Sequence, residues 1–281
     1  MESKIAQAIK IKYPPVAVIL SDNKPDQARQ FAEGKWGCIM FMMVSVLRGD
    51  TAVFSRKTFG CFGGGTGLGF GDQYKNFPGG TECFKYFLST GNENWEKGQQ
   101  VGEQVKPYMQ PESHHHFMHG ERYVKSPELV EKFIESLPIT DVPTEYVIFK
   151  PLDQVDQSVE DVEVIIYFGN MDQISGLTVL ANFGRDHNEN VIFPWAAGCQ
   201  SIGIYPFAEA KKKEPRAVLG LNDISARVYL KKLLKDDLMS FAVPLSLFYE
   251  MEANLEESFL KQNTWSQLMD MAAAEVDSDK S

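Results

Sequence analysis

The chain has 281 residues, of which 43% are hydrophobic and 12% aromatic, enough to bury a sizeable core. Its formal net charge of −10 argues against a broad surface for nucleic acid or anionic lipid, because phosphate groups attract clustered cations. No stretch reaches the ~18 apolar residues that span a membrane, and the amino end lacks the apolar core of a signal peptide. We therefore expect a cytoplasmic protein that binds neither nucleic acid nor a membrane.

The first part of the chain alternates between helical and strand-like patterns. Two prolines, Pro14 and Pro15, end the first helical pattern, because proline cannot continue a helix. In chain order the predicted elements are a helix over 2–12, a strand over 16–20, a short helix over 25–34, a buried helix over 38–49 and a strand over 51–55. A cysteine within a glycine-rich turn, FGCFGGGTGLGF, then follows at residues 59–70.

The middle of the chain is rich in turn residues, and we expect a mobile polar loop over 92–121. Regular patterns then return. The predicted elements are a helix over 126–137, strands over 145–152 and 162–169, a helix over 171–184, a strand over 190–195, and helices over 226–234 and 255–274. This mixture predicts an α+β or α/β fold with mixed sheets and flanking helices, in a single domain over 1–281.

Two segments of the chain contain the same predicted elements in the same order. An apolar helix, RGDTAVF and a turn with Cys61 are matched later by an apolar helix, GRDHNENVIF and a turn with Cys199. One interpretation is an internal duplication, with halves over 13–137 and 143–250 around a shared site and a helical carboxyl end over 251–275. The alternative is a chance match between two helix-strand-turn units.

The four cysteines are widely spaced, without the CxxC pair of a zinc ribbon or a ferredoxin-type loop. A glycine precedes Cys38, Cys61 and Cys199 alike. Cysteines from separate elements can hold an iron–sulfur cluster, and neighbouring glycines let backbone amides point at sulfur. We therefore predict a metal or iron–sulfur site at these three residues, with Cys83 as the candidate fourth ligand. Inert packing and a reactive thiol remain the alternatives.

The glycine cluster matches neither a Walker loop nor a dinucleotide-binding fingerprint, because no suitable Lys-Ser/Thr pair or amphipathic helix follows it. Candidate cofactor-binding residues are Gly60, Gly63, Gly64, Gly65 and Arg227. The glycines permit a close backbone approach. The arginine side chain can bind a carboxylate or phosphate through two parallel hydrogen bonds, although a structural ion pair is its more ordinary role.

A second cluster of candidate ligands is formed by His114, His115, His116 and His119. Pairs of histidines at helical spacing bind zinc, copper or nickel through neutral imidazoles. No acid occupies the position of the glutamate that acts as general base in the HExxH motif of metalloproteases. The pattern therefore favours a metal-binding site over a hydrolytic one. A mobile loop with adventitious metal affinity is the simpler interpretation.

Several motifs together resemble a known family. They are YPPVAVIL, RGDTAVFSRKTFGCFGGGTGLGF, AAGCQSIGIYPF and LGLNDISARVYLKKLLKDDLMSFAVPLSLFYEM. The chain resembles domain of unknown function family 169, of archaea and anaerobic bacteria, over nearly its whole length. The resemblance implies no particular reaction. Family members often carry a GC.G.R-like element near the carboxyl end, and here residues 220–227 keep the arginine but lack the cysteine.

Three functions are consistent with these features. The first is an iron–sulfur or other metal protein of anaerobic redox metabolism, which implies a redox partner protein. The second is a small-molecule protein or enzyme for organic acids, nucleotides or corrinoids, with a pocket between the halves lined by the glycine turn, Phe62, Trp195 and Arg227. The third is a homo-oligomer assembled through Leu255, Phe259, Trp265, Leu268 and Met269, for which core packing is the alternative. No catalytic triad or carboxylate pair supports an enzyme activity.

Overall fold

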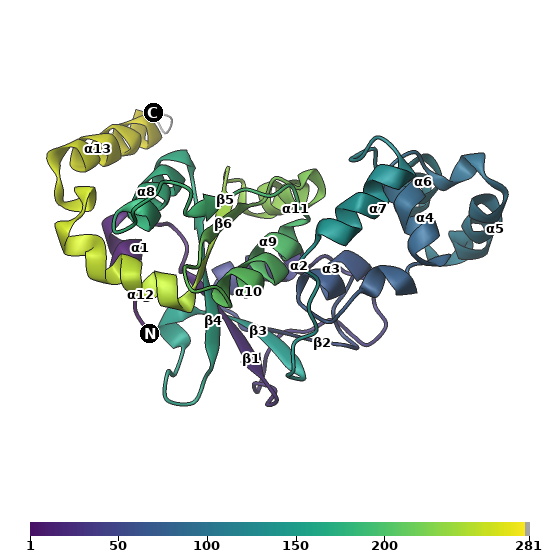
Figure 1. Ribbon diagram of the computed structural model, residues 1–281, viewed down its shortest axis with the longest axis horizontal. Helices are drawn as coiled ribbons and strands as arrows, with labels where there is room; N and C mark the ends of the chain where they lie inside the picture. The colour runs from purple at the N-terminus through teal and green to yellow at the C-terminus, as the bar shows by residue number, and fades with distance from the viewer. Residues whose placement is uncertain (279–281) are drawn as a thin grey trace. The chain divides into compact units, whose positions relative to one another are not determined.

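The computed structural model describes residues 1–278 and separates into two compact units, Met1–Phe70 with Asp141–Ser281, and Gly71–Thr140. The first unit is built on a seven-stranded mixed sheet with the order β2-β3-β1-β4-β7-β6-β5 (Figure 1). The strands are β1 (Val16–Ser21), β2 (Ala52–Ser55), β3 (Tyr146–Pro151), β4 (Val162–Gly169), β5 (Val191–Ile192), β6 (Ala217–Gly220) and β7 (Met239–Pro244). The predicted mixture of helices and mixed sheet is confirmed.

Strand β1, next to the central strand β4, pairs antiparallel with β3 and β4. Successive residues of a strand point to opposite faces of the sheet. In β1, Val16 and Val18 join one hydrophobic cluster, whereas Ala17 and Ile19 join the other. The strand is apolar on both faces because the sheet is covered on both sides.

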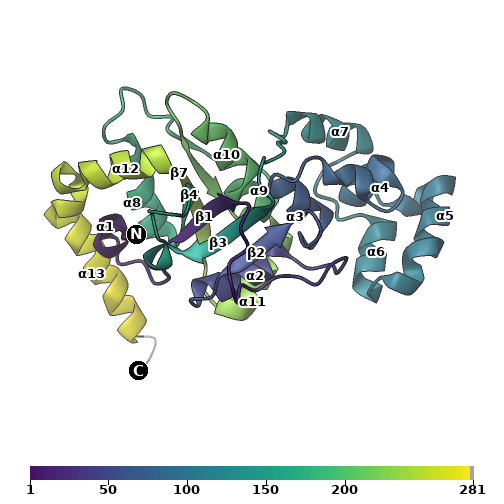
Figure 2. The same ribbon diagram turned by 90° about the horizontal axis from the view of Figure 1, so that it is seen from below.

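One face of the sheet carries the helices that matter for the candidate site (Figure 2). They are α2 (Ile39–Leu47), α3 (Phe62–Gly67), α9 (Gly198–Ile202), α10 (Ile204–Ala210) and α11 (Ile224–Leu234). Helix α2 begins directly after Cys38 and has apolar side chains nearly all round, which suits a helix packed between the sheet and α11. Helix α3 consists largely of glycine and packs against α9.

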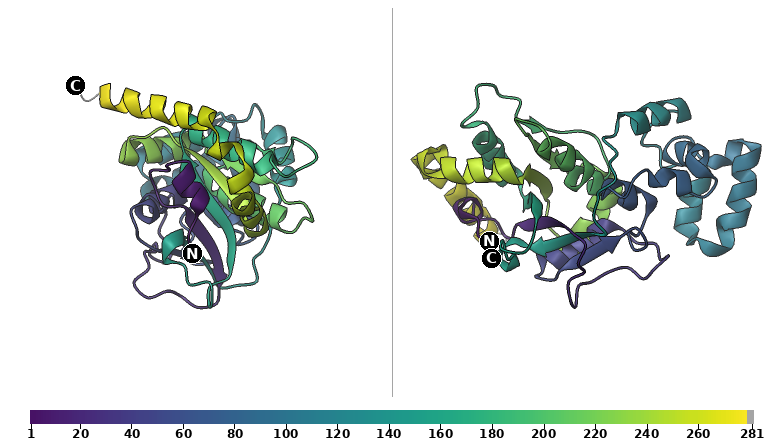
Figure 3. Two further views of the ribbon diagram at one scale, coloured as in Figure 1. Left: turned by 90° about the vertical axis from the view of Figure 1, so that its left-hand side faces the viewer. Right: turned by 60° about the horizontal axis from the view of Figure 1, so that its bottom comes forward.

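The opposite face is covered by α1 (Lys4–Ala8), α8 (Met171–Asn182), α12 (Leu245–Asn254) and α13 (Asn263–Ser278). Helix α1 lies beside α12 (Figure 3). The Trp265 indole donates a hydrogen bond to the carbonyl of Ala8 over 3.1 Å. Leu255, Trp265 and Met269 are buried in this cluster. The core-packing interpretation of these residues is therefore the one observed.

The second unit is helical, with α4 (Gly80–Leu88), α5 (Glu96–Val105), α6 (Pro111–His119) and α7 (Pro127–Ser136). Its core contains stacked aromatic rings, including the Tyr74–Phe84 pair with centroids 4.0 Å apart. The prediction of a polar loop over 92–121 is wrong, because α5 and α6 occupy most of that range. Glutamate, glutamine and lysine are good helix formers, and proline is well tolerated in the first turn.

Two other predictions fail where strand contacts override local patterns. Residues 25–34 contain no helix; instead Arg29 runs beside β2, donating its N–H to the Thr51 carbonyl and accepting from Val53 N–H, both over 2.8 Å. The predicted strand over 190–195 is reduced to β5, which ends before Pro194, a residue with no N–H to donate.

The apolar helices of the two similar segments lie on opposite faces of the sheet. Helix α2 covers one face of the sheet, whereas α8 covers the other. The boundaries of the compact units also differ from those of the predicted halves, because residues 71–140 form a unit of their own. No helix within residues 1–278 combines the length and apolar character needed to cross a membrane.

The central strand β4 supplies a test of the core. Ile166 is completely buried, so Ile166→Ala should lower the free energy of unfolding by about 2–5 kcal/mol through lost burial and a residual cavity. Val159 is 78% exposed, and Val159→Ala should change it by less than about 0.5 kcal/mol. Urea unfolding followed by circular dichroism measures both. Equal losses in the two variants would contradict this packing.

Candidate functional site

Three of the four cysteines lie at the beginnings of helices in the first unit. Cys38 is the N-cap residue of α2, and Cys61 is the N-cap residue of α3. Cys199 is the second residue of α9. None of them forms a disulfide within the described chain. Because the first N–H groups of a helix have no partner inside the helix, these positions surround sulfur with backbone donors.

The glycine turn supplies two backbone contacts to these thiols. The Gly64 N–H donates a hydrogen bond to Cys61 Sγ over 3.2 Å. The Cys199 thiol donates to the carbonyl of Gly63 over 3.1 Å. Cys61 and Cys199, separated by more than a hundred residues in the sequence, are thereby joined to the same glycine turn.

Close backbone packing explains why this turn is rich in glycine. A Cβ on Gly67 would lie 2.8 Å from Cys199 Sγ and 2.9 Å from the backbone nitrogen of Gln200. A Cβ on Gly203 would lie 2.1 Å from the Gly67 carbonyl oxygen. Any side chain at these positions would push α3 away from α9.

The glycine before each of the three cysteines has a similar reason. At Gly37 a Cβ would collide with the Phe31 ring. At Gly60, which has a positive φ of 79°, a Cβ would lie 2.3 Å from the Gly37 carbonyl. At Gly198 it would lie 3.0 Å from the Cβ of Ala226, on α11. A glycine precedes each of these cysteines because the neighbouring atoms leave little or no room for a side chain at that position.

The thiols are close enough to affect one another's protonation. Burial and, to a smaller extent, the charge of Cys61 raise the pKa of Cys38 to about 12, while the amides of Met40 and Phe41 act in the opposite direction. Burial also raises the pKa of Cys199 well above its usual range, with further contributions from the charges of Cys61 and Cys38. Both thiols are therefore protonated at neutral pH.

A partly buried carboxyl group, that of Asp223, lies near the same thiols and raises the pKa of Cys38 and Cys199. Its Oδ1 accepts hydrogen bonds from Ser225 N–H (2.9 Å) and Ala226 N–H (3.3 Å), which caps α11. Its Oδ2 accepts from Gly198 N–H over 3.2 Å, directly before Cys199. Burial raises the pKa of Asp223, although these amides favour its charged form.

Sequence reasoning missed Asp223, although its position directly before a helical pattern is typical of a capping residue. The resemblance offers a second signal. When the arginine of the expected GC.G.R-like element is set on Arg227, the cysteine of that element falls on position 223. An aspartate occupies that position in this chain.

Two further predicted site residues, Cys83 and Gly65, do not contribute a side chain to the group of three thiols. Cys83 is buried in α4 of the second unit, where burial raises its pKa, the charge of Lys97 lowers it and that of Glu82 raises it. The structure therefore groups three of the four predicted sulfur ligands within one unit. Gly65 lies inside α3, where its N–H donates to the Cys61 carbonyl over 2.9 Å. Its contribution is to the helix that follows the cysteine.

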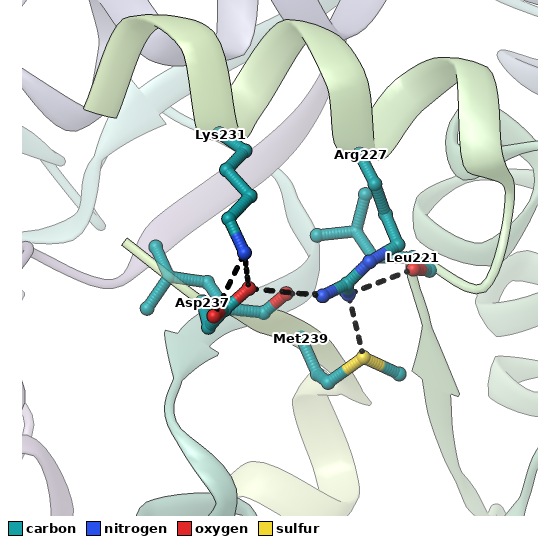
Figure 4. A network of polar contacts seen from close by, with 6 residues as sticks. Leu221, Arg227, Lys231, Asp237 and Met239 are labelled. Carbon is teal, nitrogen blue, oxygen red and sulfur yellow. Dashed lines mark hydrogen bonds and ion pairs between the residues drawn. The ribbon is translucent and has the colours of Figure 1, made fainter. Parts of the chain in front are cut away.

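Arg227 is held in a polar network (Figure 4). Its guanidinium donates to the carbonyls of Leu221 (3.3 Å) and Leu238 (3.1 Å), and lies 3.4 Å from a carboxylate oxygen of Asp237. Lys231 donates to both oxygens of the same carboxylate. These contacts give Arg227 a structural role in joining α11 to the segment before β7.

A surface hollow with a volume of about 480 Å³ lies elsewhere in the first unit. Its lining includes Arg185 and Glu250, which form an ion pair, together with Lys213 and Ser246. None of the glycines of the cysteine turn contributes to the lining. This hollow is therefore not the pocket that the small-molecule hypothesis requires.

The family comparison agrees with the resemblance in the sequence. The family model of domain of unknown function 169 (DUF169), described as uncharacterised ArCR, matches residues 4–254. The chain belongs to this family. The matched residues of this DUF169 protein include all four cysteines and Asp223. No curated protein and no solved structure matches the chain significantly.

The high thiol pKa values can be tested by alkylation. At pH 8 the thiolate fraction of Cys38 in the folded, metal-free protein should be about a thousandfold below that of an ordinary cysteine, and Cys199 should be similarly unreactive. Mass spectrometry of tryptic peptides after timed exposure to iodoacetamide measures each rate. In denaturant both should react at the ordinary rate. Native rates equal to the denatured rates would contradict the assigned burial.

Proposed function

We propose that the first unit binds an iron–sulfur cluster, or another thiophilic metal ion, through Cys38, Cys61 and Cys199. The protein would then serve in cytoplasmic electron transfer or redox sensing and would require a redox partner protein. The observation that carries the proposal is the gathering of these thiols with Asp223. Burial is the largest cause that raises the pKa values of Cys38, Cys199 and Asp223, and the charges of neighbouring acids also raise those of the two thiols.

Burial and the charges of neighbouring acids favour the protonated forms of Cys38 and Cys199. A bound metal ion supplies positive charge and deprotonates coordinating thiols. Thiolates are soft ligands, which suits iron–sulfur clusters and zinc. This chemistry favours a metal over a nucleophilic role, because a nucleophilic cysteine needs a lowered pKa.

Metal binding would change the position of at least one thiol. Within residues 1–278, no three His, Cys, Asp or Glu side chains are arranged closely enough to hold a metal ion as they stand. The Cys199 thiol now donates a hydrogen bond to the Gly63 carbonyl. Once deprotonated it would be repelled by that oxygen and attracted to a cation. We therefore include a rotation of this side chain in the proposal.

The backbone around the thiols supports an iron–sulfur cluster in particular. The Gly64 N–H already donates to Cys61 Sγ, and the amides that open α2 act on the Cys38 sulfur. Hydrogen bonds to cluster sulfurs are among the features that set a reduction potential. For the fourth position we propose Asp223, because its charge raises the pKa of both Cys38 and Cys199.

Anaerobic purification tests the proposal directly. The protein should be brown and contain iron and acid-labile sulfide. Cys38→Ser, Cys61→Ser and Cys199→Ser should each remove most of the iron, whereas Cys83→Ser, in the second unit, should retain it. Colourless, iron-free protein that also fails to take up iron and sulfide during anaerobic reconstitution would overturn the cluster.

Asp223→Asn tests the fourth position separately. Asparagine is as good an N-cap residue as aspartate, so its amide oxygen should keep the cap of α11. Its NH2 group cannot accept the hydrogen bond from Gly198 N–H, so the free energy of unfolding should fall by about 1–3 kcal/mol while the protein stays folded. The substitution removes the negative charge, and we expect a lower iron content or a changed electron paramagnetic resonance spectrum relative to the unsubstituted protein. An unchanged iron content and spectrum would exclude Asp223 as a ligand while leaving the three cysteines in place.

A further inference from the structure

Helix α6, in the second unit, carries four of the five histidines of the chain. The helix is firmly anchored. Phe117 is fully buried and its ring stacks on Phe77 with centroids 5.9 Å apart. The ring nitrogen Nε2 of His114 lies 3.1 Å from the Gly102 carbonyl, which ties the helix to α5. The remaining histidines are therefore presented by a fixed helix and not by a mobile loop.

His115 and His119 stand one helical turn apart on an exposed face of α6. Their ring centroids are 4.3 Å apart. Two histidines at this spacing on a helix are the arrangement that binds zinc in metalloproteases, since both imidazoles then reach one ion. His116 is placed less well, with its ring centroid 6.2 Å from that of His115.

Glu93 adds a second, independent observation. Its Oε2 lies 3.0 Å from Nδ1 of His119. A carboxylate at Nδ1 accepts a hydrogen bond from the N–H at that nitrogen, which leaves the lone pair of a neutral ring on Nε2. The position of Glu93 is secured by its neighbour Asn92, whose side chain donates to the carbonyls of Cys83 and Phe117.

We propose that His115 and His119 bind one divalent transition-metal ion of the zinc, nickel and copper class, with Glu93 orienting the ring of His119. Imidazole nitrogen is the ligand that such ions share. Water completes the coordination shell, because the histidine pair has no third protein ligand arranged around it within residues 1–278. This site does not depend on the thiols of the first unit and differs from them in ligand softness.

Nickel binding to the full-length protein tests the site, with Ni²⁺ as the probe in isothermal titration calorimetry. We expect one imidazole-dependent Ni²⁺ per chain. His115→Ala and His119→Ala should each weaken binding by at least about tenfold, and Glu93→Gln by about tenfold through loss of the orienting carboxylate. Both histidines are exposed, and alanine favours helix, so circular dichroism should show unchanged folding.

Matched controls separate this site from other metal binding. His187→Ala removes the one histidine outside α6, which is also partly exposed and near a carboxylate, and should leave Ni²⁺ affinity unchanged. Cys199→Ser should also leave the histidine-dependent step unchanged, even if it abolishes the proposed cluster. Equal weakening by His187→Ala and His119→Ala, or no weakening by His115→Ala, would overturn the site and indicate adventitious binding only.

Discussion

The candidate thiol site depends on close contact between glycine backbones. Helix α3 approaches α9 so closely that a single Cβ at Gly67 would meet both the sulfur of Cys199 and the backbone beside it. The turn at Gly60 approaches the Gly37 carbonyl in the same way. This packing buries Cys199, partly buries Cys38 and Cys61, and brings three distant segments together. The glycine-rich sequence is therefore explained by contact between parts of the protein, without a phosphate group.

The same burial determines the chemistry that the site can perform. Sulfur in such surroundings is a poor nucleophile, because its proton is held tightly. The cost of ionising several neighbouring acids disappears when a cation is bound. Asp223 links this chemistry to the fold, since one carboxylate caps α11 and also accepts a hydrogen bond from the backbone at Gly198. The site is thus built from capping positions and backbone amides as much as from side chains.

The two compact units offer different ligand chemistry. The first unit gathers sulfur in a buried environment, and the second displays imidazoles on the surface of a helix. Soft thiolates and borderline imidazoles prefer different metals and oxidation states. The histidine cluster was visible in the sequence, but its geometry depends on α6 being a helix. That helix is held by the burial of Phe117 and by the contact of His114 with α5.

The sequence alone determined the strands with continuous apolar runs, such as β1 and β4, and the helices with clear boundaries, such as α2, α7 and α8, because burial and capping leave local patterns. It also indicated Cys38, Cys61 and Cys199 as one set through the glycine before each. The tertiary structure decided that residues 25–34 follow a strand instead of forming a helix, and that Asp223 joins the thiols. It also decided that Cys83 lies in the other unit. These outcomes depend on contacts between residues far apart in the chain, and local periodicity and spacing carry no information about which distant backbone a segment will meet.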